Sequence, residues 1–179
     1  MKLIVPTLAL KNAFDAFYDD YIRHDAMNAE RYRLGHHDYA SYIHQLDNEA
    51  NGINLRTGYV PSDHYWLVDN HCSHLLGCIR LRHRIDNDFL YQEGGHIGYD
   101  MMPSARRQGN GSLMLKLVLV KAREKGFSKV LVTADQDNIA SRKVIENNGG
   151  QLENMIFGPV LSRCIARYWI DLTNYPCSC

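Results

Sequence analysis

The chain has few cysteines and no excess of either charge. It holds five cysteines among 179 residues. That number is odd and the spacing fits no disulfide framework for a chain of this length, so we expect a reducing, cytoplasmic setting. The 20 Lys and Arg residues are balanced by 20 Asp and Glu residues. Proteins that grip nucleic acid or an anionic membrane usually carry a basic excess, so the sequence predicts neither partner.

Long hydrophobic runs and metal-binding motifs are also missing. No apolar run approaches the roughly 20 residues that cross a bilayer. The opening residues MKLIVPTLALKNAFDAF lack the small-residue cleavage site of a signal peptide. The segment His71 to His74 contains three potential metal ligands. Adjacent positions of a turn rarely converge on one ion and the spacing matches no zinc pattern, so we expect no metal.

The patterns that are present predict one α/β domain over residues 1–179. Hydrophobic residues make up 45% of the chain, an ordinary globular value. Residues 25–37 and 50–63 are expected to be connections. Alternating or continuous apolar runs predict strands, and apolar steps of three and four predict helices, which together give a mixed sheet. The expected strands are 2–6, 64–69, 75–83, 95–102, 129–135, 151–157 and 164–172, and the expected helices are 7–23, 38–49, 110–125 and 138–147.

The segment from Arg106 to Ser112 is the most informative motif. It stands between a predicted strand and a predicted helix, and it contains Gly109 and Gly111. A helix N-terminus offers unpaired amides and a positive dipole end, which suit a phosphate. Glycines let the backbone turn tightly and let an anion approach closely. Arg106 and Arg107 add positive charge, so a diphosphate-bearing cofactor is one interpretation, and a glycine-rich turn with two solvated arginines is the other.

Two common phosphate-binding motifs do not fit this segment. A P-loop needs Lys and then Ser or Thr after its last glycine, whereas Ser-Leu follows Gly111. A dinucleotide-binding turn needs a third glycine, and Met114 occupies that position. The remaining pattern is Arg-x-x-Gly-x-Gly, which Arg106, Gly109 and Gly111 satisfy.

Residues 94–150 closely resemble the acetyl-CoA-binding core of GNAT (GCN5-related) N-acetyltransferases. Three features carry the resemblance: a strand that leads to Pro103, the Arg106-x-x-Gly109-x-Gly111 turn that opens a helix, and a buried strand followed by Asn138-x-x-Ser141. The likeness extends more loosely from about residue 65 to residue 169. The whole chain resembles a poorly characterised bacterial branch of predicted acetyltransferases.

The resemblance implies a fold and a cofactor site. The fold is a mixed, mostly antiparallel sheet of six or seven strands, flanked by helices, with two splayed central strands that receive acetyl-CoA. It implies that residues 99–102 line the pantetheine arm and that the amide of Met101 or Met102 polarises the thioester carbonyl. The remaining implied cofactor-binding residues, with amides from 108 to 112 on the pyrophosphate, are Arg106, Arg107, Gln108, Gly109, Asn110, Gly111, Ser112, Asn138 and Ser141. Asn138 would also be explained as a helix cap.

The proton-transferring residues are less clear from the sequence. The acceptor must attack as a neutral amine, so a base is needed. Many members of the family place a Glu where this chain has His96, and a neutral imidazole can serve near pH 7. Glu93 and Asp100 are alternatives, and a His packed within the sheet is the structural explanation. The Tyr that protonates the thiolate in many members is replaced by Ile145, which leaves Tyr99, Tyr168 or no dedicated acid.

The acceptor side is expected in the helices of residues 7–60, where Tyr and His are frequent. In the family this region and the loop between the last two strands bind the acceptor, here a small-molecule or peptide amine that the sequence does not identify. Transfer would be direct, within a ternary complex. Two other functions stay open: a non-catalytic acyl-CoA sensor, which the absent Tyr favours slightly, and a protein that binds another nucleotide. Homodimers are common in the family, although no feature of the sequence demonstrates one.

Overall fold

The computed structural model describes residues 1–175 of the chain, and its centre is a seven-stranded sheet. The strand order is β1-β2-β3-β4-β5-β7-β6. All neighbouring strands are antiparallel except β4 and β5, which are parallel. The mixed, mostly antiparallel sheet predicted from the sequence is therefore confirmed. The strands are β1 (Lys2–Ile4), β2 (Ser62–Val68), β3 (Leu75–Arg82), β4 (Ile97–Met101), β5 (Lys129–Asp135), β6 (Gln151–Gly158) and β7 (Arg163–Asp171).

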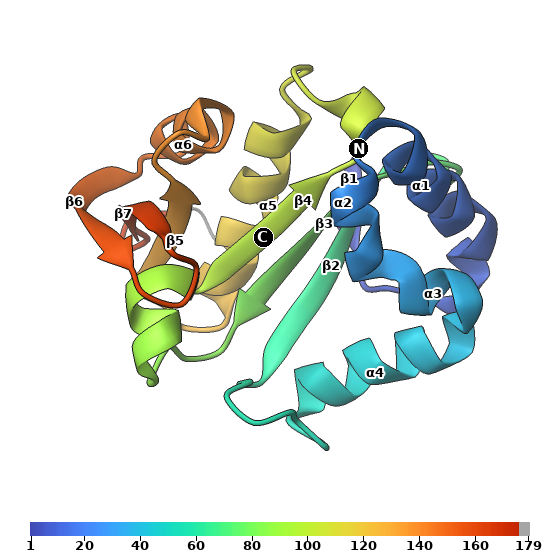
Figure 1. Ribbon diagram of the computed structural model, residues 1–179, viewed down its shortest axis with the longest axis horizontal. Coiled ribbons are helices and arrows are strands. Elements are labelled where there is room, and N and C mark those ends of the chain that lie inside the picture. The colour runs from blue at the N-terminus through green and yellow to red at the C-terminus, as the bar shows by residue number, and fades with distance from the viewer. Residues whose placement is uncertain (176–179) are drawn as a thin grey trace.

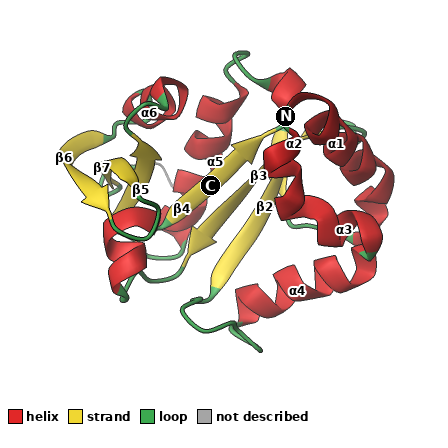
Figure 2. Cartoon of the chain, viewed as in Figure 1, coloured by secondary structure: helices red, strands yellow, loops and turns green. Residues whose placement is uncertain are grey.

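The helices form two groups on the two faces of this sheet (Figures 1 and 2). One face packs on α5, through a cluster that includes Leu115, Val118 and Val132. The other face packs on α1 and α4, through a cluster that includes Phe14 and Trp66. Burial of these apolar side chains from water stabilises both layers. The helices are α1 (Lys11–His24), α2 (Ala26–Ala29), α3 (Arg33–His37), α4 (Tyr39–Asn51), α5 (Asn110–Glu124) and α6 (Ile139–Glu146).

The segment 25–37, predicted as a connection, is instead a chain of short helical turns. It contains α2, a 3-10 turn at Glu30–Tyr32 and α3. Each turn has at most five residues, too few to show the helical period in the sequence. Tertiary packing holds them: Tyr32 is buried, and a Cβ on Gly35 would lie 2.5 Å from the Phe14 ring. A π-helical turn at Leu90–Gly94 was also not predicted.

The two central strands separate soon after they meet. β4 and β5 share a single register pair, Ile97 with Val132. They approach closely at Gly95, whose φ is 62° and where a Cβ would lie 2.7 Å from the Leu131 carbonyl oxygen. Because parallel strands end at the same edge, the splay opens toward the helices that follow them, α5 and α6. The splayed central strands implied by the family resemblance are present.

Candidate functional site

A cleft of about 2100 Å³ begins at this splay and continues over β2 and β3 toward α4. It is lined by both the amides near the start of α5 and the side chains of the N-terminal helices. Eleven of the residues that the sequence singled out line it: Glu93, Tyr99, Asp100, Met101, Arg106, Arg107, Gly109, Gly111, Ser112, Asn138 and Ser141. Among the described residues, His96, Met102, Gln108 and Asn110 are not part of its lining.

The N-terminus of α5 presents backbone donors to the cleft. Gly109 precedes the helix with φ 80° and makes no side-chain cap bond. The first amides of a helix have no partner within it, so those of Asn110, Gly111 and Ser112 are available to an anion. The Asn110 side chain is buried and donates to the Ala105 carbonyl oxygen at 3.0 Å. Asn110 therefore braces the turn with its side chain, and only its amide can serve the cofactor.

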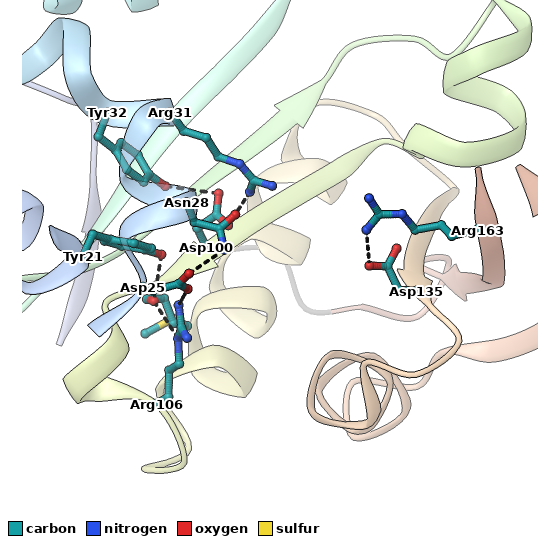
Figure 3. Close-up of polar contacts among 10 residues, drawn as sticks. Tyr21, Asp25, Asn28, Arg31, Tyr32, Asp100, Arg106, Asp135 and Arg163 are labelled. Atoms are coloured by element: carbon teal, nitrogen blue, oxygen red, sulfur yellow. Dashed lines mark hydrogen bonds and ion pairs between the residues drawn. The ribbon is translucent and has the colours of Figure 1, made fainter. Parts of the chain in front are cut away.

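Arg106 binds the N-terminal helices more closely than the sequence suggested. Its Nη2 lies 2.7 Å from Asp25 Oδ2, and its Nε donates to the Met101 carbonyl oxygen at 3.2 Å (Figure 3). The hydrogen bond from Arg106 to the Asp25 carboxylate lowers the pKa of Asp25 below its ordinary value. The charge of Arg106 is therefore partly compensated, whereas Arg107 is exposed. Gln108 donates to the Ser104 carbonyl oxygen at 3.0 Å and also supports the turn.

The structure separates Met101 from Met102 as donors to a thioester. The Met102 amide donates to the Leu76 carbonyl oxygen at 2.9 Å and is used by the sheet. Amides alternate in direction along a strand, so that of Met101 points away from β3 and into the splay. The Met101 carbonyl oxygen, on the same side, accepts from Tyr21 Oη at 2.9 Å. Of the two alternatives, only the Met101 amide faces the cleft.

Tyr99 spans the splay from β4 to α6. Its Oη lies 2.7 Å from Ser141 Oγ and donates to the Ser141 carbonyl oxygen at 3.3 Å. Burial raises the pKa of Tyr99 to about 12, so the phenol is protonated at neutral pH. Asn138 caps α6, with its Oδ1 accepting from the Ser141 amide at 3.0 Å. The cap explanation for Asn138 is thus present, and its side chain also lines the cleft.

His96 packs within the sheet rather than in the cleft. Its Nδ1 accepts from the Leu131 amide at 2.9 Å, and its ring contacts those of Phe127 and Trp169. The residue is 8% exposed. Burial, and then the charge of Arg82, lower its pKa to about 4. A base must reach the acceptor's proton, and this placement favours the structural role over the catalytic one.

The other sequence-based candidates for proton transfer are engaged elsewhere. The Glu93 carboxylate accepts from the amides of Val160 and Leu161, at 3.0 and 2.7 Å, and so anchors the β6–β7 loop. The Tyr168 hydroxyl donates to Glu146 and accepts from Arg142. Glu93 is 3% exposed and Tyr168 1% exposed, so neither group is accessible to a substrate.

Asp100 remains as the acidic candidate beside the splay. Its Oδ1 lies 2.8 Å from Arg31 Nη1, and its Oδ2 accepts from Tyr32 Oη at 3.1 Å (Figure 3). Both carboxylate oxygens therefore bind residues of the N-terminal helical segment. Across the cleft in the same view, Arg163 and Asp135 form a second ion pair, 2.7 Å apart. Charged pairs from distant parts of the chain thus stand on both sides of the opening.

The sequence analysis missed a group of charged residues further along the cleft. Arg80 and Arg82 extend from β3, and His64 of β2 lies 2.8 Å from the Glu49 carboxylate of α4. All four line the cleft. A signal existed in the sequence, because arginines at alternate positions of an otherwise apolar strand point to one face of the sheet.

Neither a cluster of metal ligands nor a membrane-spanning helix is found among the described residues. Within residues 1–175, no group of three or more His, Cys, Asp or Glu is arranged to hold a metal ion. No helix in that range is long and apolar enough to cross a membrane. The three cysteines that lie in it, Cys72, Cys78 and Cys164, are free.

Comparisons with known proteins agree with this arrangement. No curated protein sequence matches the chain. RimJ of Mycobacterium smegmatis, solved with a CoA disulfide, is 14% identical, with a TM-score of 0.70 over 98% of this chain and 84% of that one. The Salmonella typhimurium enzyme that modifies the N-terminal serine of ribosomal protein L7/L12 is 15% identical, with a TM-score of 0.65 over 94% and 93%. The microcin C7 self-immunity acetyltransferase MccE, solved with acetyl-CoA and AMP, is 13% identical, with a TM-score of 0.62 over 94% and 91%.

At these levels of identity the similar structures show a shared fold, and membership of a family rests on a match to a family model. The model described as "Acetyltransferase (GNAT) domain" matches residues 7–151. The match spans the N-terminal helices, the splayed strands and the turn before α5, which together make most of the cleft. The chain therefore belongs to the GNAT acetyltransferase family.

Proposed function

We propose that this chain transfers the acetyl group of acetyl-CoA directly to an amine held in the cleft. The observation that carries the proposal is the amide of Met101, which faces the splay beside the free amides of the α5 N-terminus. Acetyl-CoA supplies a thioester, whose carbonyl oxygen needs a donor, and a pyrophosphate, which needs amides and positive charge. Both needs are met within one cleft, and the absence of side chains at Gly109 and Gly111 leaves room for the pyrophosphate.

The residues of the chain divide the work between positioning and proton transfer. The acceptor nitrogen gains the acetyl group and loses a proton, and CoA leaves as a thiolate that takes one up. Tyr99 is protonated at neutral pH and faces the splay, which fits it to donate that proton. Asp100, one residue before Met101, fits the task of attracting the acceptor's ammonium group and receiving its proton, directly or through water. Most of the rate gain would come from orientation and from the Met101 amide.

The side of the cleft formed by β2, β3 and the N-terminal helices, which we call the acceptor wall, supports an amine on a small molecule or a peptide. The cleft is open and carries charged side chains, and two of the similar structures are named for acting on ribosomal proteins. The test is CoA release from acetyl-CoA against amino acids, polyamines, aminoglycosides and short peptides, with the protein's own thiols blocked. Release with one class would support transfer and identify the acceptor class. Binding of acetyl-CoA with no release for any amine would favour the sensor function instead.

A further inference from the structure

The guanidinium groups of Arg80 and Arg82 converge over Gly98 of β4. A Cβ placed on Gly98 would lie 3.7 and 3.8 Å from the two Nη atoms of Arg82 and 3.9 Å from Nη2 of Arg80. Arg80 is the register partner of Gly98 in the β3–β4 ladder. Two positive groups from β3 thus meet inside the cleft, over the bare backbone of β4, the strand that also carries Asp100 and Met101.

No carboxylate of the described residues forms an ion pair with either of these two cations. Within residues 1–175, Arg80 makes no hydrogen bond or ion pair, and its Nε is buried without a partner. Arg82 is 9% exposed, and its Nη1 donates to the carbonyl oxygens of Gly94 and Gly95, each at 2.9 Å. Burial, and then the charge of Arg80, lower the pKa of Arg82 to about 9. Like charges that are buried or half-buried, as Arg82 and Arg80 are, destabilise a fold unless an anion completes the site.

Glu49 is the acidic residue whose charge acts on both arginines. Its carboxylate already accepts from Gln45 at 2.9 Å and lies 2.8 Å from His64 Nε2. A purely structural role accounts for one nitrogen of Arg82, which supports the bend at Gly94 and Gly95. It does not account for Arg80, which reaches the same point and makes no hydrogen bond to any described residue.

We propose that Arg80 and Arg82 bind an anionic group of the acceptor, a carboxylate or a phosphate. The planar fork of Arg suits both groups, which accept paired hydrogen bonds from it. The proposal rests on the acetyl-transfer function proposed above and extends it to the chemical class of the acceptor. The acceptor is then an amine that also carries a negative charge.

The strand spacing also indicates how far apart these two groups lie. Asp100 follows Gly98 by two residues and shares its face of β4, so the two positions are separated by roughly 7 Å. An acceptor whose amine lies near Asp100 and whose anion lies over Gly98 needs about that separation between the two. The α-carboxylate of a free amino acid lies too close to its own amine. A peptide N-terminus with an acidic or phosphorylated side chain close to it has the required reach.

The first experiment needs no ligand and uses Gly98, whose conformation accepts a side chain. Gly98→Asp places a carboxylate between the two guanidinium groups, and Gly98→Asn is its neutral twin of the same shape. We expect Gly98→Asp to unfold at a temperature higher than Gly98→Asn by about 3–5 °C, because only the charged side chain pairs with the arginines. Equal or reversed melting temperatures would overturn the site as an anion receptor.

The second experiment measures binding to the protein saturated with CoA. The probes are tetrapeptide amides with a free N-terminus and Asp, Asn, phosphoserine or Ser at the second or third position. We expect calorimetry to show at least ~10-fold tighter binding of an Asp or phosphoserine peptide than of its neutral twin. Arg80→Gln should abolish that preference, whereas Arg84→Gln should keep it, since Arg84 pairs with Asp86 at the surface and does not line the cleft. Comparing the Asp and phosphoserine peptides distinguishes carboxylate from phosphate.

The same peptides, tested for CoA release from acetyl-CoA, separate the two proposals. Acidic preference without CoA release would refute acetyl transfer to these amines and leave the anion site intact. CoA release with equal binding of charged and neutral twins would overturn the anion site and leave acetyl transfer intact. Equal binding of the charged peptides and their uncharged counterparts, with or without turnover, would contradict an anion site at Arg80 and Arg82.

Discussion

The two walls of the cleft differ in the chemistry that they present. The cofactor wall consists of the Met101 edge of β4 and the turn at residues 109–112, and it offers mainly backbone amides. The acceptor wall consists of the N-terminal helices and the cleft-facing side chains of β2 and β3, and it offers charged groups such as Arg31 and Arg80. Amides keep the same chemistry whatever side chain follows them, so a wall built on them can serve one constant cofactor. A wall of side chains can change its ligand by substitution.

The largest predicted effect tests whether the acceptor wall is part of the central core. Phe14 is fully buried, and the centroid of its ring lies within 5.5 Å of the ring centroids of Tyr39, Tyr42 and Trp66. We expect Phe14→Ala to lower the free energy of unfolding by about 3–5 kcal/mol, because it removes apolar contact and leaves a cavity. Urea denaturation measures this, with Met27→Ala as the control at a residue that is 89% exposed. A loss as small as the control's would mean that these helices unfold separately.

A charge on the cofactor wall should separate binding from stability. Ser112 lies in the first turn of α5, where an acidic side chain favours the helix dipole but repels a phosphate. We expect Ser112→Glu to bind acetyl-CoA about 100-fold more weakly, or ~2.7 kcal/mol, while its melting temperature is maintained. Ser112→Gln, of equal size and no charge, should retain most of the affinity in calorimetry. Unchanged affinity in Ser112→Glu would contradict a pyrophosphate at this turn.

The pH dependence of stability distinguishes a structural His96 from a catalytic one. Its pKa of about 4 in the folded protein lies below the ordinary value of about 6.5, so the unfolded chain binds more protons between these values. The free energy of unfolding should therefore fall by on the order of 2 kcal/mol as the pH drops from 6.5 to 4. His96→Asn keeps an acceptor for the Leu131 amide but does not titrate, so its stability curve should be flatter there. Turnover of this variant should match the wild type over pH 6–9, and a large loss would restore the base role.

The smallest predicted effect concerns the acid at the junction of the two walls. Tyr99→Phe should lower kcat about 10-fold and leave acetyl-CoA affinity nearly unchanged, because the ring keeps its packing while the proton-donating hydroxyl is lost together with its bonds to Ser141. With a pKa of about 12, Tyr99 should cause no decline of kcat at pH values below about 11. Tyr168→Phe is the matched control, because its hydroxyl binds Arg142 and Glu146 outside the cleft. Equal rates for both variants would show that the thiolate leaves without a dedicated acid.

The position that we propose for the cofactor could be predicted from the sequence because its determinants are local. A buried apolar run, two glycines at fixed spacing and a helix start are all encoded within about fifty residues, and the resemblance to the GNAT core depended on that order. The same signals gave the strands and the long helices, with errors mainly at their ends. The sequence also drew attention to residues 99–101, although it left open which amide faced the splay.

Tertiary structure alone decided the acceptor wall and the fate of the catalytic candidates. The turns of residues 25–37 are too short to show a period, and burial of Tyr32 holds them in place. His96 is removed from the cleft by a bond to Leu131, 35 residues away in the chain. Arg80 and Gly98 meet only because β3 and β4 pair in one register. Local patterns determine which elements form, whereas long-range pairing and packing determine which side chains share a space.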